Sequence, residues 1–280
     1  MEISGMNSTY RFFTLEYFFK AMNDLEINNI ELWTAPHHFF VDYQGYNDKD
    51  LKRLKTMINK YKVNVQCICP EQTNPKIGNL AVLDLEAHNR MISYFKYQIN
   101  LAKELEASKV LITAGWGYLD KDKSNAWTQS VQSMKELCAY GKKLGVKIII
   151  EALQPDESNL VNNISDLNNY LIEVDSDNLK ICIDFGAMAR SEENLKDYFQ
   201  AFGEDIEHIH FVDGKPTGHL ALGDGDRNLE KDIKDLKQFG YENYLTLETV
   251  NSKYYMHPKK ADQQSINVYR KIRKGIESND

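Results

Sequence analysis

The stretch "VKIIIEA", from Val146 to Ala152, decides the fold that the sequence predicts. Three consecutive isoleucines are typical of a strand that is buried on both faces, as in a parallel sheet covered by helices. The run ends in Glu151, and a buried carboxylate lowers stability unless a positive group meets it. Glu151 therefore needs a bound cation, a role as a base, or an ordinary ion-pair partner.

The same pattern, a short apolar run followed by a longer amphipathic segment, repeats about eight times along the chain. The strand candidates are Glu2–Asn7, Asn29–Trp33, Val63–Cys69, Lys109–Gly115, Val146–Ala152, Leu179–Phe185, His208–Asp213 and Tyr244–Val250. Three of the helices between them are expected to begin at Thr14, Asp84 and Ser124, and the last of these to stop at Gly145.

Alternating strands and helices indicate parallel strands joined by crossover helices. Eight such units without a break in composition predict an α/β fold, a single (β/α)8 TIM barrel that occupies residues 1–280 as one domain. No GxGxxG motif follows the first strand, so the usual sign of a dinucleotide-binding sheet is missing.

The composition is that of an ordinary globular protein. Hydrophobic residues make up 42% and charged residues 27% of the 280 positions. The net charge of -7 weighs against nucleic-acid binding. No apolar run approaches the roughly 20 residues of a membrane span, and the amino terminus lacks a signal-peptide pattern. We therefore expect no membrane association, a cytoplasmic location, and reduced thiols at Cys67, Cys69, Cys138 and Cys182.

Metal-capable side chains lie at or near the ends of four successive predicted strands: Glu151, Asp184, His210 and Glu248. One acid at a strand end is more often a helix cap or half of an ion pair. Four such residues together indicate a shared site, because the strand ends of a barrel converge on one pocket at its carboxyl face. Three carboxylates with one imidazole predict a site for a divalent metal ion, Mn²⁺ or Mg²⁺ in preference to structural zinc, with Co²⁺ and Zn²⁺ as alternatives.

The predicted seventh strand carries two histidines. We expect His208 and His210 to lie on opposite faces of this strand. His210 is nearer the carboxyl end, so it is the one expected to enter the barrel, with His208 facing the helix layer.

Four further residues are candidates for substrate binding. Glu157 follows Glu151 by six positions and could accept a hydrogen bond from a hydroxyl or sit in the first turn of a capped segment. His219 lies in a glycine-rich loop that could fold over the pocket or be merely flexible. Asp213 could orient the substrate or serve as a turn residue. Trp116 could form an aromatic wall for a sugar or plug the top of the barrel.

Several motifs resemble those of a known family: "IELW", "PE" with the nearby Asn74-Pro75, "EALQPDESNLV", "DFG", "HIHFVDGKPTGHLALGDGD" and "GYENYLTLETV". In combination and over nearly the whole length, they resemble the xylose-isomerase-like barrel superfamily of sugar isomerases and 3-epimerases. The resemblance is strongest to its fructoselysine 3-epimerase branch.

This resemblance implies that Glu151, Asp184, His210 and Glu248 hold a divalent ion, Mn²⁺ first, and that Glu151 and Glu248 are also the acid and base. The two glutamates would invert C3 of a ketose or a ketose conjugate through a metal-stabilised enediolate. Glu157 would bind the sugar. The resemblance also implies a homo-oligomer, a dimer or a tetramer.

Two departures from the free-ketose epimerases are visible. Ala187 stands where many of them have a histidine, and Gly214–Pro216 lacks an arginine that they carry shortly after the metal histidine. Both departures favour a conjugated sugar over a free hexulose as the substrate.

Other functions stay open on the same scaffold. They are an epimerase for a free or phosphorylated ketose, an aldose–ketose isomerase, a dehydratase, and a sugar-binding barrel without catalysis. A DNA-repair endonuclease of this superfamily needs a multi-zinc cluster with many histidines. The chain has only seven histidines and is acidic, which argues against that class.

Overall fold

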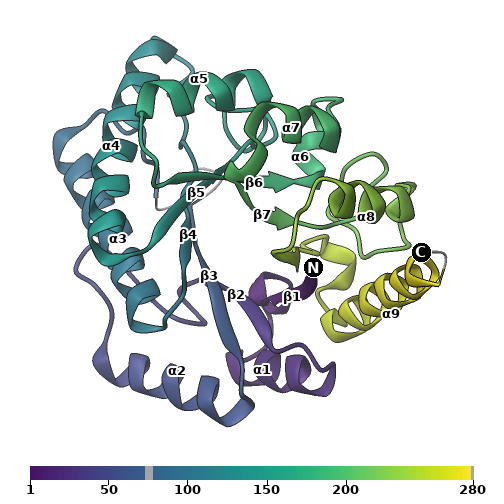
Figure 1. The fold of residues 1–280 in the computed structure, drawn as a ribbon. Helices are drawn as coiled ribbons and strands as arrows, with labels where there is room; N and C mark the ends of the chain where they lie inside the picture. Colours follow the sequence, from purple (N-terminus) through teal and green to yellow (C-terminus); the bar gives the residue numbers. More distant parts are fainter. Residues whose placement is uncertain (73–77, 279–280) are drawn as a thin grey trace.

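The computed structural model describes residues 1–72 and 78–278, and Figure 1 shows a ring of helices around a central barrel of strands. Parallel strands pair in sequence order, and β1 pairs with β8 to close the barrel. The strands are β1 (Glu2–Met6), β2 (Asn29–Thr34), β3 (Asn64–Pro70), β4 (Lys109–Leu111), β5 (Lys147–Glu151), β6 (Leu179–Asp184), β7 (Ile206–His210) and β8 (Tyr244–Leu247). The predicted (β/α)8 barrel is confirmed. Asn74-Pro75 lies outside the described residues.

Helices follow the strands and form the outer layer. They are α1 (Leu15–Asp24), α2 (Asp48–Tyr61), α3 (Leu85–Glu104), α4 (Lys123–Leu144), α5 (Ile164–Val174), α6 (Phe185–Arg190), α7 (Leu195–Phe202), α8 (Leu229–Gln238) and α9 (Pro258–Glu277), with short 3₁₀ turns η1 (Asn7–Tyr10), η2 (Gly203–Asp205) and η3 (Ser252–Tyr254). Within the described residues, no helix combines the length and the apolar character that crossing a bilayer requires.

The predicted helix starts are largely confirmed. The side chain of Thr14 accepts a hydrogen bond from the Tyr17 N–H, and that of Asp84 accepts one from the Ala87 N–H. The prediction that Ser124 caps α4 is wrong by two residues, because the carboxylate of Asp122 accepts the Ser124 N–H instead. Gly145 ends this helix as predicted, with a left-handed φ of 70°.

Several strands end earlier than predicted, β1, β5 and β6 by one residue and β4, β7 and β8 by three or four. In β4 and β7, side chains or loops take up the next backbone groups. Beyond β4, the Thr113 N–H donates to the side chain of Gln72 rather than to a neighbouring strand. Beyond β7, Asp213 pairs in an antiparallel bridge with Leu220. The predicted ends at Gly115 and Asp213 therefore lie in the loops that shape the carboxyl face of the barrel.

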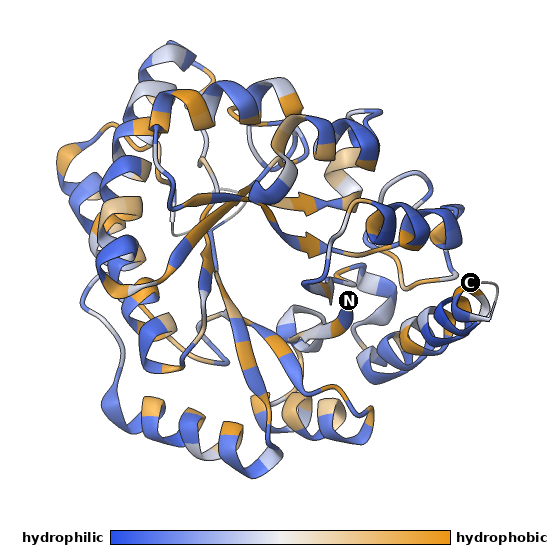
Figure 2. Cartoon of the chain, viewed as in Figure 1, coloured by the Kyte–Doolittle hydropathy of each residue, from blue (hydrophilic) through white to orange (hydrophobic). Residues whose placement is uncertain are grey.

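Side chains alternate along each strand between two cores. Ile148 and Ile150 of β5 pack into the large cluster between the barrel and the helices, whereas Ile149 joins a small cluster inside the barrel. Figure 2 shows the apolar strands enclosed by helices whose outer surfaces are hydrophilic. Glu151 follows Ile149 by two residues, so the same alternation directs it into the open end of the barrel.

The last helix closes the ring. α9 packs against α8, and its Lys259 Nζ lies 2.6 Å from Asp24 Oδ2 of α1. Tyr269 of α9 donates a hydrogen bond to the backbone oxygen of Met1, with an O–O distance of 3.0 Å. The four cysteines are buried and unpaired, as predicted.

One buried acid in this region makes stability depend on pH. Asp262 of α9 is buried and accepts a hydrogen bond from the Tyr10 hydroxyl at 2.5 Å. Burial raises the pKa of Asp262 to about 7. Its unfolded pKa is about 4, so this carboxyl stabilises the fold fully below pH 4, and that contribution is lost as the pH rises through 7.

We expect Asp262→Asn to remove this loss, because an amide accepts the Tyr10 hydrogen bond without ionising. Between pH 5 and pH 8 the free energy of unfolding of the variant, measured by urea denaturation, should fall less than that of the unmodified protein. The matched control is Asp50→Asn on the exposed face of α2, which should keep the original pH dependence. Identical slopes for all three proteins would contradict the assignment.

Candidate active site

Four side chains from the ends of successive strands meet at the carboxyl face of the barrel. His210 Nδ1 lies 3.0 Å from Glu248 Oε2, 3.2 Å from Glu151 Oε2 and 3.9 Å from Asp184 Oδ2. Glu151, Asp184 and His210 are the last residues of β5, β6 and β7, and Glu248 comes directly after β8. The structure therefore brings together the four residues that the strand ends predicted.

This set of donors fits a divalent metal ion. The ligand atoms of Glu151, Asp184 and His210 all lie within 4.8 Å of one another, and so do those of Asp184, His219 and Glu248. His210 Nδ1 is buried and makes no hydrogen bond within the described residues, although three carboxylates face it. Burial also raises the pKa of Glu151 to about 7. Neighbouring acids around an unused imidazole nitrogen are stabilised when they share a cation.

The expectation that His208 faces the helix layer is wrong. Residues two positions apart in a strand share a face, so His208 points into the barrel together with His210. Both side chains are fully buried, and their ring centroids lie 5.2 Å apart. Burial lowers the pKa of His208 to about 4, so its neutral imidazole can donate Nε2–H to an acid.

That acid is Glu31 of β2, which the pattern of strand ends does not predict. Its Oε2 lies 2.6 Å from His208 Nε2 and 3.3 Å from His210 Nε2, and its side chain is fully buried. Burial alone would raise the pKa of Glu31, but the two facing imidazoles outweigh burial and hold it below its usual range. A carboxylate that accepts the Nε2–H of His210 leaves Nδ1 free to bind a metal. The one signal in the sequence was an acid that interrupts the apolar run "IELW".

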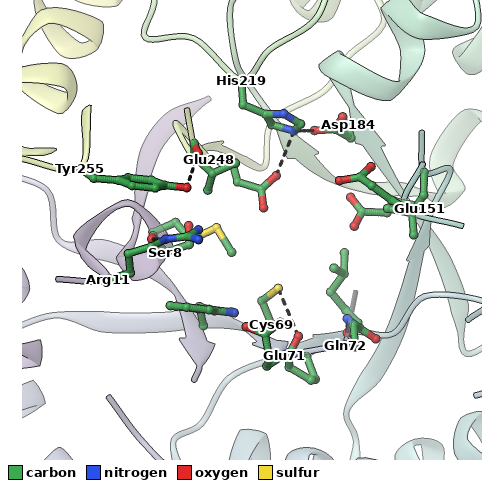
Figure 3. Close-up of a pocket in the computed structure, with 17 residues that line it drawn as sticks. Ser8, Arg11, Cys69, Glu71, Gln72, Glu151, Asp184, His219, Glu248 and Tyr255 are labelled. Carbon is green, nitrogen blue, oxygen red and sulfur yellow. Dashed lines mark hydrogen bonds and ion pairs between the residues drawn. The ribbon is translucent and has the colours of Figure 1, made fainter. Parts of the chain in front are cut away.

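A cavity of about 340 Å³ opens above these ligands. Figure 3 shows Glu151, Asp184, His219 and Glu248 around one side of it. Of the predicted substrate-binding residues, Glu157 and His219 line this cavity. Burial, followed by the charge of Asp184, raises the pKa of Glu157 to about 7.

His219 contacts two of the predicted metal ligands. Its Nε2 lies 3.2 Å from Asp184 Oδ2 and 3.5 Å from Glu248 Oε2. Burial alone would lower the pKa of His219, but the charges of Asp184 and Glu248 raise it to about 10. The glycine-rich loop therefore does fold over the pocket and delivers a positive side chain to the acids.

Asp213 and Trp116 do not line the cavity in this structure. The carboxylate of Asp213 accepts the backbone N–H groups of Gly214, Gly223 and Arg227 at 2.8, 2.9 and 3.2 Å. A Cβ at Gly225 would lie 2.0 Å from Asp213 Oδ1, so only glycine fits there. Asp213 thus shapes the loop that carries His219. Trp116 is half-buried and packs edge-on against Tyr118.

Comparisons with known proteins show the family and the fold of the chain. The sequence model of the family described as "Xylose isomerase-like TIM barrel" matches residues 19–272. Fructoselysine 3-epimerase of Shigella flexneri is 30% identical over 262 residues, which cover 92% of this chain and 93% of that protein. Inosose isomerase of Bacillus subtilis is 27% identical over 183 residues, covering 61% of this chain and 64% of that protein.

Solved structures share the fold at low identity. D-psicose 3-epimerase from Clostridium cellulolyticum H10 superposes with a TM-score of 0.78 at 16% identity, covering 97% of this chain and 99% of that one. The 3-keto-D-glucoside 4-epimerase from E. coli superposes with a TM-score of 0.80 at 17% identity and the same coverage.

The contact between Glu31 and His210 predicts a role for Glu31 in metal binding. Glu31→Gln removes the charge that holds the proton on His210 Nε2, so Nδ1 becomes a poorer ligand. We expect the affinity for Mn²⁺, measured by isothermal titration calorimetry, to fall about 10- to 100-fold.

The matched control is Glu207→Gln, on β7 directly before His208. Glu207 faces outward and pairs with Lys147 Nζ at 2.6 Å, so its loss should leave Mn²⁺ affinity unchanged. Glu31 has no part in metal binding if a folded Glu31→Gln protein, checked by thermal melting, binds Mn²⁺ as tightly as the unmodified chain.

Proposed function

The chain belongs to the xylose isomerase-like TIM-barrel family, and from this premise we propose that it is a divalent-metal-dependent sugar 3-epimerase. Its substrate would be a ketose or a ketose conjugate of the fructoselysine type. Identity of 30% to an epimerase across nearly the whole chain supports an enzyme of the isomerase class. The observation that carries the proposal is the approach of two glutamates to one imidazole nitrogen, 3.2 Å for Glu151 and 3.0 Å for Glu248.

Glu151, Asp184, His210 and Glu248 would hold the ion. Their oxygen-rich donor set supports Mn²⁺ over a structural zinc site. When bound, such an ion would act as a Lewis acid toward the ketose carbonyl and make the neighbouring C3 proton more acidic.

Glu151 and Glu248 would move the proton. They extend from β5 and from the end of β8, strands that lie three positions apart around the closed barrel. A substrate held between them presents one face of C3 to each carboxylate. One glutamate removes the proton from its face and the other returns a proton to the opposite face, which inverts the centre. Positioned proton transfer of this kind contributes about 10²- to 10⁴-fold in rate.

The other residues of the cavity would position the sugar. The Glu157 carboxyl group lines the cavity and can bind a sugar hydroxyl. His219, held against Asp184, can place its positive imidazole beside the oxygens on which negative charge develops. Both lie in loops that follow strands, where substrate recognition in this fold is located.

The two-glutamate mechanism is tested by following the C3 proton. With fructoselysine and Mn²⁺ in D₂O, we expect deuterium to enter at C3 and the C3 epimer to form, both measured by NMR. Glu151→Gln and Glu248→Gln should each lower the rate at which the C3 epimer forms about 10²- to 10⁴-fold, because inversion needs both proton carriers. The variant that keeps the glutamate facing the C3 proton should still exchange that proton. The metal content of each variant is measured in parallel, so that loss of the ion is not mistaken for loss of the base.

The matched control is Glu230→Gln on α8, an exposed glutamate that pairs with Lys234 at 2.7 Å. This variant should exchange the C3 proton and form the epimer at the rates of the unmodified protein. Formation of the C3 epimer at the original rate in metal-loaded Glu248→Gln or Glu151→Gln would overturn the assigned roles. A product in which the carbonyl has moved from C2 would identify an aldose–ketose isomerase instead.

A further inference from the structure

Arg11 lies on the wall of the cavity beside Tyr255, across from Glu151 and Asp184 (Figure 3). We propose that Arg11 binds an anionic group at the end of the substrate remote from C3. The substrate would then be a ketose linked to a carboxylate or a phosphate, rather than a neutral sugar. This inference rests on the proposed epimerase function, and it narrows the class of substrate.

The guanidinium group is held in place by two aromatic rings. Arg11 directly follows η1 in the loop after β1, and β1 lies between β8 and β2 in the barrel. Its Cζ lies 4.5 Å from the ring centroid of Tyr255, which follows β8, and 5.4 Å from that of Trp33 in β2. Cation–π contacts of this length stabilise a guanidinium and fix its plane.

The N–H donors of the Arg11 guanidinium that the protein does not use indicate a bound ligand. Arg11 Nε donates to the backbone oxygen of Ser8 at 3.1 Å. The ring contacts use the faces of the guanidinium and leave the in-plane Nη1 and Nη2 donors available. Within residues 1–72 and 78–278, no carboxylate lies within 4.0 Å of this group. Two unused donors in one plane match the paired oxygens of a carboxylate or a phosphate.

The charges around the cavity also indicate that Arg11 binds an anion. Its lining contains five acids, Glu71, Glu151, Glu157, Asp184 and Glu248, and the basic residues among the described lining are Arg11 and His219. His219 lies against Asp184 and Glu248. Of these two basic residues, Arg11 is therefore the one that remains available to bind a ligand. An elongated substrate can place its C3 between the glutamates and its anion at Arg11.

Two substrate pairs distinguish the sources of the anion. The first is fructoselysine and its decarboxylated analogue, fructose linked to 1,5-diaminopentane, which differ by one carboxylate. The second is fructose 6-phosphate and fructose, which differ by one phosphate. Values of kcat/KM are measured for each member with Mn²⁺, and equilibrium binding is measured by calorimetry in parallel.

We expect the unmodified protein to show a higher kcat/KM for the anionic member of one pair. The pair with this preference identifies the anion as a carboxylate or a phosphate. Arg11→Gln should lower this anionic-to-neutral ratio about 10- to 100-fold, chiefly through KM, since the contact is made before and during the reaction. Arg11→Lys keeps the charge but not the planar fork, so its ratio should be intermediate. Arg53→Gln on the exposed face of α2 is the matched control and should keep the original ratio.

Equal use of both members in each pair, or a preference that Arg11→Gln retains, would overturn the role of Arg11. Failure of the proposed epimerase function would give a different result in these experiments. If no ketose is epimerised, calorimetry still measures whether the anionic ligands bind more tightly than the neutral ones and whether Arg11→Gln removes that difference. Binding that discriminates through Arg11 without turnover would overturn only the epimerase assignment.

Discussion

The gathering of three carboxylates around Nδ1 of His210 is the constraint on which the rest of this structure depends. Glu151, Asp184 and Glu248 approach that atom within 3.9 Å from three different strands. Such a group is stable only if a cation is shared and if the imidazole keeps one orientation. The closed barrel makes the sharing of a cation possible, because it directs the ends of successive strands to one place.

A second layer inside the barrel meets the requirement for orientation. Glu31 lies below the ligands and contacts both His208 and His210 through their Nε2 atoms. Buried acids and imidazoles are stable when they form hydrogen bonds with one another. Here these side chains come from inward-facing positions of β2 and β7. The apolar cluster of Met6, Cys67, Cys69, Leu111, Ile149 and Cys182 fills the interior beside them. The four strand-end residues and Glu31 are therefore held by strands, whereas Glu157 and His219 reach the cavity from loops.

The cavity itself has two chemical ends. The acids and His219 occupy the side where proton transfer is proposed, and Arg11 lies across from them between two aromatic rings. This separation of charge suits a substrate with a neutral reacting centre and a charged extension.

The sequence by itself determined the barrel and the four strand-end residues that meet at its carboxyl face, because both depend on local patterns. Alternating strands and helices specify the topology, and acids such as Glu151 that end or interrupt apolar runs mark the open end of the strands. The prediction that His208 lies on the opposite face from His210 was wrong, because residues two positions apart in a strand share a face.

Only the tertiary structure decided which distant residues meet. Glu31 and His208 are separated by 177 positions, and no local pattern pairs them. Arg11 reaches the cavity because β1 lies between β8 and β2 once the barrel closes. The sequence predicted Asp213 and Trp116 near the pocket, but neither lines it, and Asp213 instead binds backbone N–H groups of its own loop. Strand order follows from local periodicity, whereas loop side chains take positions set by three-dimensional packing.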